Sequence, residues 1–418
     1  MNILQKSILL IVVTIAATSC DGIIGYTKQM MKIDKGQRQY RDNQEVADDT
    51  IHFVINNQDQ MLLKATVNGV EDTVLYDTGC SSPAILFYTQ ETKPEGMKFY
   101  RVPLMGADKE TKLRLSPVPV HIETPMCIVD HFGNAMLLEK QTHSCDNEPY
   151  LSEYTILGFS GLDYTPFSID FTNNRIYSMW KMPEVDTTGY FPVKCKLDKM
   201  QNVLFVYPII NGIEYECIFD TGNSGGILIK DEQKIENHTD VDLLFEGSYG
   251  MSIGGLTEKQ HIVVTPENTI EFAGQKDTVP VTYLGDNLAF NNVGLQYIKR
   301  FDWIVGQQVQ RDENSVIVSR TIKMYAKPHV SDTTKLHIDY PVARYAVTTA
   351  DGTLKITTRL LDGQERFEVG DQIVSVDGEA ITEENICYYY DLLTETKDWS
   401  GFDIQVKGSE GSTKHARQ

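Results

Sequence analysis

The chain has 418 residues, enough for two or three domains of ordinary size. Hydrophobic residues make up 41% and charged residues 23%, which disfavours a disordered chain, a collagen-like fibre and a coiled-coil rod. Lys and Arg total 38 against 58 Asp and Glu, so the formal net charge is −20. A surface this acidic repels phosphate backbones, so we expect no nucleic-acid partner and a preference for neutral or basic partners.

The first twenty residues have the pattern of a bacterial lipoprotein leader. Lys6 precedes an apolar run from Ile8 to Ala17, which is too short for a transmembrane helix and has the length of a signal-peptide core. The run ends in Ala-Ala-Thr-Ser-Cys, which resembles a lipobox, where the Cys20 thiol takes a diacylglyceryl group. We therefore expect an exported protein that Cys20 anchors to a lipid bilayer, at the periplasmic face or the cell surface. The alternative is an ordinary signal peptide with a chance cysteine.

Six cysteines follow the leader, and none forms a Cys-x-x-Cys pair, which disfavours a zinc ribbon or a thioredoxin-type site. An exported protein can form disulfides. Closeness in sequence suggests two bridges and two free thiols: Cys127–Cys145, Cys195–Cys217, and free Cys80 and Cys387.

An internal repeat organises the middle of the chain. Residues 62–87 and 205–230 share an alternating strand, an Asn-Gly pair, a second strand, the triplet Asp-Thr-Gly, small polar residues and another apolar strand. Asn-Gly is a strong hairpin signal, because both turn positions need positive φ. A second shared feature, apolar residues followed by a Gly, a turn and a strand, occurs at 154–178 and 293–306. The unit is therefore a β-rich lobe that is used twice.

The two Asp-Thr-Gly triplets, each with a later apolar-apolar-Gly, resemble the signature of the pepsin and retropepsin aspartic proteases over about residues 50–325. The resemblance implies a predominantly all-β, bilobal fold in which Asp77 and Asp220 meet in a shared cleft. Two adjacent carboxyl groups share one proton, so the pair can activate a water against a peptide bond. The implied substrate is a protein or peptide, and no metal or cofactor is implied.

The residues beside each aspartate fit that chemistry. Gly79 and Gly222 let the backbone approach a carboxylate closely, and their amides can donate to it. By the resemblance, Thr78 and Thr221 form an interlobe hydrogen-bonded pair beneath the dyad, because a hydroxyl can both donate and accept.

The chain departs from the family pattern after each glycine, where Cys80 and Asn223 replace the usual Ser, Thr or Ala. Cys is a weak donor, so we expect a dyad that is active nearer neutral pH. The acidic surface adds a negative field, which should raise the pKa of the dyad and disfavour acidic substrates. Flaps that close over the substrate are expected around Gly106 and Gly254, with an ordinary surface hairpin as the alternative at each.

Two other functions are open. Gly-Asn-Ser-Gly-Gly at 222–226 resembles the nucleophile loop of trypsin-like serine proteases, with Ser224 as the nucleophile. That mechanism needs an upstream His and Asp, and the upstream histidines lack the family's sequence context: His52, His121, His131 and His143. The second alternative is a non-catalytic peptide- or glycan-binding protein on the same folds, with the two aspartates apart or the cleft filled.

The pattern changes again from about Thr333. Residues 366–378 resemble the core signature of PDZ domains, which bind extended peptides by strand addition. The signature residues are Gly370, Asp371, Asp377 and Gly378. A helix over 386–394 is expected beside the groove, and no Gly-Leu-Gly-Phe-type loop precedes it. We expect a peptide ligand there; an appendage without a ligand is the alternative.

The predicted organisation has five parts. They are a signal peptide at 1–19, lipidated Cys20 with a tether at 20–49 that contains one short helix around Lys28 to Arg38, a first protease lobe at 50–185, a second lobe at 186–328 and a small α+β PDZ domain at 333–415.

Overall fold

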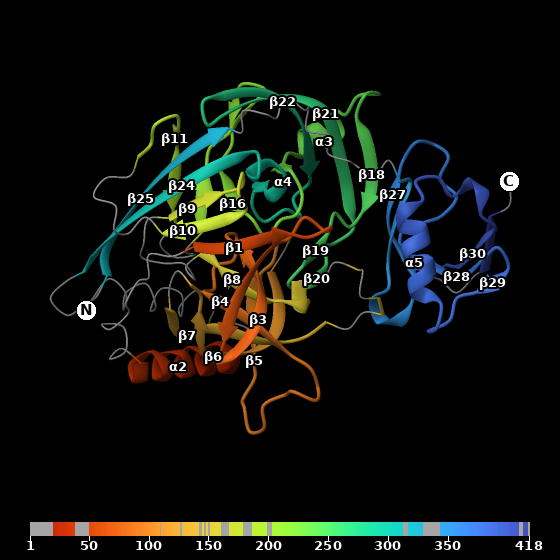
Figure 1. Cartoon of the computed structure of the whole chain (residues 1–418). Helices are drawn as coiled ribbons and strands as arrows, with labels where there is room; N and C mark the ends of the chain where they lie inside the picture. Colours follow the sequence, from red (N-terminus) through yellow and green to blue (C-terminus); the bar gives the residue numbers. More distant parts are fainter. Residues whose placement is uncertain are drawn as a thin grey trace.

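The computed structural model describes residues 20–37, 50–108, 110–125, 128–141, 144–145, 148, 151–159, 167–178, 186–198, 203–311, 317–328, 343–408 and 413–416. The expected signal peptide at 1–19 lies outside these residues, as do residues 38–49, Cys127, His143 and the expected start of the PDZ domain at 333–342. The chain is mainly β, as the sequence predicts, and Figure 1 shows the first lobe in orange and yellow, the second in green, and a C-terminal domain in blue.

The first lobe consists of strands and one short 3₁₀ turn, η2 (Leu151–Glu153). Its strands are β1 (Thr50–Ile55), β2 (Met61–Val67), β3 (Val70–Asp77), β4 (Ala84–Tyr88), β5 (Tyr100–Met105), β6 (Glu110–Glu123), β7 (Ile128–Glu139), β8 (Thr155–Gly158), β9 (Phe167–Asp170) and β10 (Arg175–Ser178).

The second lobe repeats this plan and adds two short helices, α3 (Glu232–Glu236) and α4 (Leu295–Ile298). Its strands are β11 (Phe191–Val193), β12 (Cys195–Leu197), β13 (Leu204–Val206), β14 (Ile209–Ile210), β15 (Ile213–Glu214), β16 (Cys217–Asp220), β17 (Ile227–Lys230), β18 (Leu243–Gly247), β19 (Met251–Ser252), β20 (Gly255–Leu256), β21 (Gln260–Phe272), β22 (Gln275–Leu284), β23 (Asn292–Gly294), β24 (Phe301–Arg311) and β25 (Ile317–Pro328).

The repeat in sequence is a repeat in topology. Both Asn-Gly pairs form the predicted hairpins, with φ of 51° and 84° at Asn68-Gly69 and 49° and 84° at Asn211-Gly212. β3 runs parallel to β8 and β16 runs parallel to β23. β4 and β17 pack antiparallel on the other side of β8 and β23. Each Asp-Thr-Gly loop therefore begins at the end of a buried central strand.

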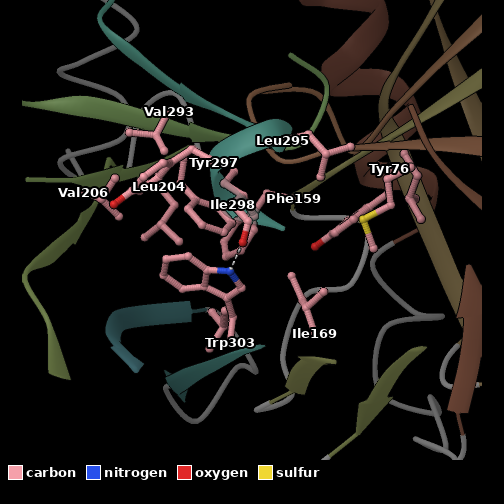
Figure 2. Close-up of a cluster of buried hydrophobic side chains, with 14 of the residues drawn as sticks. Tyr76, Phe159, Ile169, Leu204, Val206, Val293, Leu295, Tyr297, Ile298 and Trp303 are labelled. Carbon is pink, nitrogen blue, oxygen red and sulfur yellow. Dashed lines mark hydrogen bonds between the residues drawn. The ribbon is translucent and has the colours of Figure 1, made fainter. Parts of the chain in front are cut away.

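The two lobes are joined by a shared sheet and a shared core. β1, β10 and β9 of the first lobe continue into β24, β25 and β11 of the second, with Ile169 opposite Trp303 at the junction. Figure 2 shows Tyr76 and Phe159 of the first lobe in one buried cluster with residues around Trp303, whose indole donates to Ile298 O at 2.9 Å. Burial of this apolar surface fixes the lobes against each other.

The tether contains a helix, as expected around Lys28 to Arg38, but the helix begins earlier and docks on the first lobe. α2 (Cys20–Gln37) packs against β5, β6 and β7 of the first lobe. Its Gln29 amide reaches Pro117 O at 3.3 Å and accepts from the Tyr100 hydroxyl at 2.9 Å. Within the described part of the chain, no helix combines the length and apolar character needed to cross a membrane.

The C-terminal domain has its own core around Phe367, Leu393 and Trp399. It contains β26 (Tyr345–Thr348), η4 (Ala350–Gly352), β27 (Lys355–Leu360), β28 (Gln372–Val376), β29 (Glu379–Ala380), α5 (Ile386–Glu395), η5 (Trp399–Gly401), β30 (Ile404–Lys407) and β31 (Thr413–Ala416). Helix α5 lies where the sequence predicts a helix. β27 also pairs antiparallel with β18, so the second lobe and this domain share a sheet.

The disulfide expectations are wrong in three places. Cys145 of the first lobe is bonded to Cys387 on α5, so Cys387 is not free and Cys145 does not take Cys127. Cys195 and Cys217 are both free thiols. They lie opposite the same residue, Val206, from either side. Two strand spacings separate them, about 9–10 Å, which a disulfide cannot span.

Candidate active site

Asp77 and Asp220 meet between the lobes. Their side chains are adjacent, so that Asp220 contributes to the raised pKa of Asp77, although 143 residues separate them in sequence. Within each lobe the same amide supports the carboxylate: Gly79 N donates to Asp77 Oδ1 and Gly222 N donates to Asp220 Oδ1, both at 2.9 Å. Both aspartates remain partly exposed. Equivalent loops of the two lobes therefore hold two adjacent carboxyl groups that are both partly open to solvent between the lobes.

The glycine of each loop lies against the aspartate of the other lobe. A Cβ added at Gly79 would be 2.5 Å from Asp220 Cγ, and one added at Gly222 would be 2.3 Å from Asp77 Cγ. Carbon atoms do not approach this closely without a bond, so only glycine permits the carboxyl groups to meet. The sequence suggested close backbone approach at these positions, and the structure adds that it crosses between lobes.

The two threonines tie the loops together beneath the carboxyl groups. Thr78 N donates to Thr221 Oγ1 at 3.1 Å, and Thr221 N donates to Thr78 Oγ1 at 2.9 Å. Each hydroxyl then donates to a carbonyl of the opposite lobe, Phe219 O at 2.6 Å and Tyr76 O at 2.7 Å. Both threonines are fully buried. Four reciprocal hydrogen bonds thus fix the register between the lobes.

Thr78→Val should destabilise the protein without changing its shape much. The substitution removes one hydroxyl and leaves the buried Phe219 O and Thr221 N without their partners, which costs about 2–4 kcal/mol for two groups. Urea unfolding would measure the loss. Thr66→Val on β2, where the hydroxyl has no such role, is the matched control and should change stability little. A loss at Thr78 no larger than that control would contradict the expected role.

The surroundings of the two aspartates are unequal. The Cys80 thiol donates to Ser82 O at 3.4 Å. At Asp220, by contrast, Asn292 Nδ2 donates to Oδ2 at 2.6 Å, and Asn223 holds Asn292 by donating to its Oδ1 at 2.8 Å. Side-chain donation to the outer oxygen is therefore present at Asp220 and, among the described residues, absent at Asp77.

This asymmetry separates the roles of the two carboxyl groups. Burial and the adjacent Asp220 raise the pKa of Asp77 well above its usual range, against the lowering effect of the Gly79 and Cys80 amides. A charge-assisted hydrogen bond such as the one from Asn292 favours an ionised acceptor. The raised pKa favours a protonated Asp77, and the donation from Asn292 is made to Asp220 alone of the two aspartates. Burial and Asp77 also raise the pKa of the Cys80 thiol, so that thiol stays protonated.

Both expected flap glycines lie in hairpin turns, Gly106 between β5 and β6 and Gly254 between β19 and β20. The turn of the second lobe contacts the first lobe: a Cβ on Gly254 would be 3.0 Å from Thr111 Oγ1 on β6. Asp108 Oδ2 accepts from Glu258 N at 2.8 Å, and Ala107 O accepts from Ala289 N at 2.9 Å. The hairpins are in mutual contact in this structure.

Ser224 is exposed in the loop after Asp220. Its side chain has no hydrogen bond to a histidine among the described residues. His121 pairs instead with Glu123 at 2.6 Å, and His52 lies on β1 opposite Arg175. His143 lies outside the described residues, and the side chain of His131 is not among the described ones. The described geometry provides no activated serine.

The PDZ-signature residues occupy turns of the C-terminal domain. Gly370 and Gly378 have φ of 95° and 82°, and Asp377 has φ of 52°. Asp371 is buried and accepts from Glu368 N at 2.9 Å, while Asp377 accepts from Asp403 N at 2.8 Å. These residues therefore shape the turns on either side of β28.

Two residues near the dyad were not singled out in the sequence. Asn292 could have been found by comparing the two copies. Asp77 is opposite Gly158 and Asp220 is opposite Gly294, so Asn292 stands where the first copy has Ile156. Tyr249, which follows β18, has a buried hydroxyl without a partner among the described residues, and burial with Asp108 and Asp220 raises its pKa. No repeat partner or motif marks Tyr249.

Comparison with protein-family models and with curated proteins finds no match. Among solved structures, a retropepsin-like aspartic protease from Rickettsia conorii matches 32% of this chain and 92% of its own chain, with 18% identity and a TM-score of 0.21. The similarity to that protease is weak and covers one part of the chain.

Proposed function

We propose that this protein is an aspartic endopeptidase, with Asp77 and Asp220 as its catalytic residues. The observation that carries the proposal is the adjacency of the two carboxyl groups, each held by the amide of its own Asp-Thr-Gly loop and each lying against the glycine of the other loop. Like charges this close cannot both ionise, so the pair holds one proton near neutral pH. The same closeness argues against a non-catalytic protein in which the aspartates are apart.

The unequal surroundings assign a direction to the proton transfers. Ionised Asp220 takes a proton from a water that lies between the carboxyl groups. At the same time the oxygen of that water attacks the peptide carbonyl carbon. Protonated Asp77 gives its proton to the carbonyl oxygen, which yields a neutral tetrahedral diol. When the diol collapses, the C–N bond breaks, the amine takes the proton held by Asp220, and Asp77 recovers one from the diol. The products are a carboxylic acid and an amine.

The remaining parts of the chain supply location and binding in this proposal. Cys20, once acylated, anchors the protein to a bacterial lipid bilayer after export. The C-terminal domain is PDZ-like and presents a peptide-binding groove beside α5. The net charge of −20 favours neutral or basic protein substrates over acidic ones.

The direct test is cleavage of an unfolded protein by the purified chain from pH 3 to 8, with and without pepstatin, which mimics the tetrahedral diol. We expect cleavage that pepstatin inhibits and serine-protease inhibitors do not. Cleavage that ends with Ser224→Ala while Asp77→Asn stays active would establish the serine mechanism instead.

Asn292→Ala should shift the pH dependence of the reaction. The amide of Asn292 stabilises the ionised form of Asp220, so its loss raises the pKa at which the dyad first ionises. A hydrogen bond to a charged group is worth about 1.5–3 kcal/mol, or about one to two pH units. Because the fully protonated dyad is inactive, the acidic limb of kcat/KM should move to higher pH by that amount.

Asn291→Ala is the matched control for that shift. Asn291 is the adjacent residue, and its side chain bonds Lys230 N and Glu216 O rather than the dyad. Its variant should keep the acidic limb in place. Equal pH profiles for both variants would contradict the assignment of Asp220 as the ionised member.

A further inference from the structure

The C-terminal domain grips a segment of the first lobe. Ser144 N donates to Thr349 Oγ1 at 3.3 Å, and Cys145 is buried in the domain's own core and bonded to Cys387 at the start of α5. Glu148 is 3% exposed, and both of its carboxylate oxygens accept from Thr349 N, at 3.1 and 2.9 Å. The hydroxyls of Thr348 and Thr349 donate to the same carboxylate.

The hydrogen bonds at this contact satisfy the buried carboxylate of Glu148. A buried carboxylate is costly unless its oxygens receive several hydrogen bonds. The Thr349 amide and the hydroxyls of Thr348 and Thr349, at the end of β26, donate these hydrogen bonds to the Glu148 carboxylate. The disulfide also joins the first lobe covalently to the C-terminal domain. Ser144, Cys145 and Glu148 of the first lobe are therefore bound at the junction of β26 and α5.

The same domain holds the base of the chain segment that leads into the β19–β20 hairpin. β27 pairs with β18, and Arg359 bonds Glu246 at 2.7 Å. Gly247 has a φ of 142°, and a Cβ there would be 2.2 Å from Thr357 O, so the two backbones are in close contact. The Thr358 hydroxyl donates to Ser248 O at 2.6 Å. Tyr249 and the β19–β20 turn follow directly.

The gripped segment also reaches the tip of that hairpin. Gln141 lies between the end of β7 and Ser144, and its side-chain amide donates to Ile253 O at 3.3 Å. The tip is thus held by the segment that the disulfide secures, and its base by β27. The hairpin also touches the first lobe directly, because Gly254 lies against Thr111 and Asp108 Oδ2 accepts from Glu258 N.

We propose that Ser144, Cys145 and Glu148 form, with the C-terminal domain, a disulfide-secured latch, and that this latch keeps the β19–β20 hairpin against the first lobe, where it closes the cleft at the dyad. The inference rests on the proposed peptidase function. A dithiol reductant opens the latch by thiol–disulfide exchange. The two thiols of the reductant form a disulfide, the Cys145–Cys387 bond breaks, and the two protons of the reductant end on the Cys145 and Cys387 thiols. The segment is then held by hydrogen bonds alone, and the hairpin opens more often.

Hydrogen exchange of the full mature protein, oxidised and after reduction with dithiothreitol, tests the latch without relying on activity. Mass spectrometry should show the bond reduced, and amides in 249–257 should exchange about tenfold faster. In the same samples kcat/KM for peptide cleavage should rise about threefold or more, since opening limits substrate entry. Cys387→Ser and Glu148→Gln should reproduce part of both changes without reductant.

Matched variants separate the latch from general effects. Cys195→Ser alters a free thiol, and Glu71→Gln alters an exposed carboxylate on β3, so both should behave as the unaltered protein. Unchanged exchange at 249–257 after complete reduction would overturn the latch. Faster exchange with an equal or lower cleavage rate would overturn its control of the cleft. If no form cleaves peptides, the peptidase proposal fails and the exchange data still decide the latch.

Discussion

Asp77→Asn and Asp220→Asn should each lower kcat/KM for peptide cleavage by at least about 10³-fold. Each change removes one of the two proton positions on which water attack and carbonyl protonation depend, and general acid–base catalysis alone is worth about 10²–10⁴-fold. Because the two carboxyl groups act as a unit, the double variant should be about as inactive as either single variant. Steady-state cleavage of one fluorogenic peptide at several pH values would measure all three.

Stability distinguishes loss of chemistry from loss of fold in these variants. The raised pKa of Asp77 means that ionisation there is disfavoured by burial and by Asp220. A neutral amide relieves that cost, so thermal unfolding should be unchanged or occur at higher temperature. Asp240→Asn, on an exposed loop, is the matched control and should retain activity. Either dyad variant keeping full activity while folded would show that the dyad is not catalytic.

The centre of this candidate site could be predicted because its determinants are local. Asn-Gly dictates a hairpin, the hairpin sets the register of β3 and β16, and each strand ends at an aspartate. The repeat thus places one aspartate at the end of each strand, and the resemblance to the bilobal aspartic proteases implies that the two meet, as they do. The mainly β character follows in the same way from alternation and turn residues.

Other parts of the site depend on contacts that no local pattern encodes. The donor to Asp220 comes from Asn292, where duplication would predict the apolar residue of the first copy. The partner of Cys145 lies 242 residues away and is set by how the C-terminal domain docks on the lobes. A short helix within the polar tether could be predicted, but not its docking, in which Gln29 and Tyr26 contact Tyr100 on the first lobe. Tertiary packing decides each of these, and sequence spacing does not record it.

Alanine substitutions of Gly79 and Gly222 should have the largest effect on activity after those of the two aspartates. Gly222→Ala would place a methyl group 2.3 Å from Asp77 Cγ, and Gly79→Ala would place one 2.5 Å from Asp220 Cγ. The neighbours are the backbone loops and short carboxyl side chains of the dyad, which the threonine network holds. Neither can retreat without separating the lobes, so the methyl group must push the two carboxyl groups apart.

We therefore expect either alanine variant to lower kcat/KM by at least about 10²-fold, because a displacement near 1 Å at the reacting groups has that effect. Overpacking should also lower the free energy of unfolding by about 1–3 kcal/mol. Gly401→Ala, where an added Cβ meets nothing within 4 Å, is the matched control and should leave both quantities unchanged. Unlike the Asn variants, which keep the carboxyl-sized groups in contact, the Ala variants should also weaken pepstatin binding, since its hydroxyl needs both groups at once. Tight pepstatin binding by Gly222→Ala would show that the loops have more freedom than their four reciprocal hydrogen bonds allow.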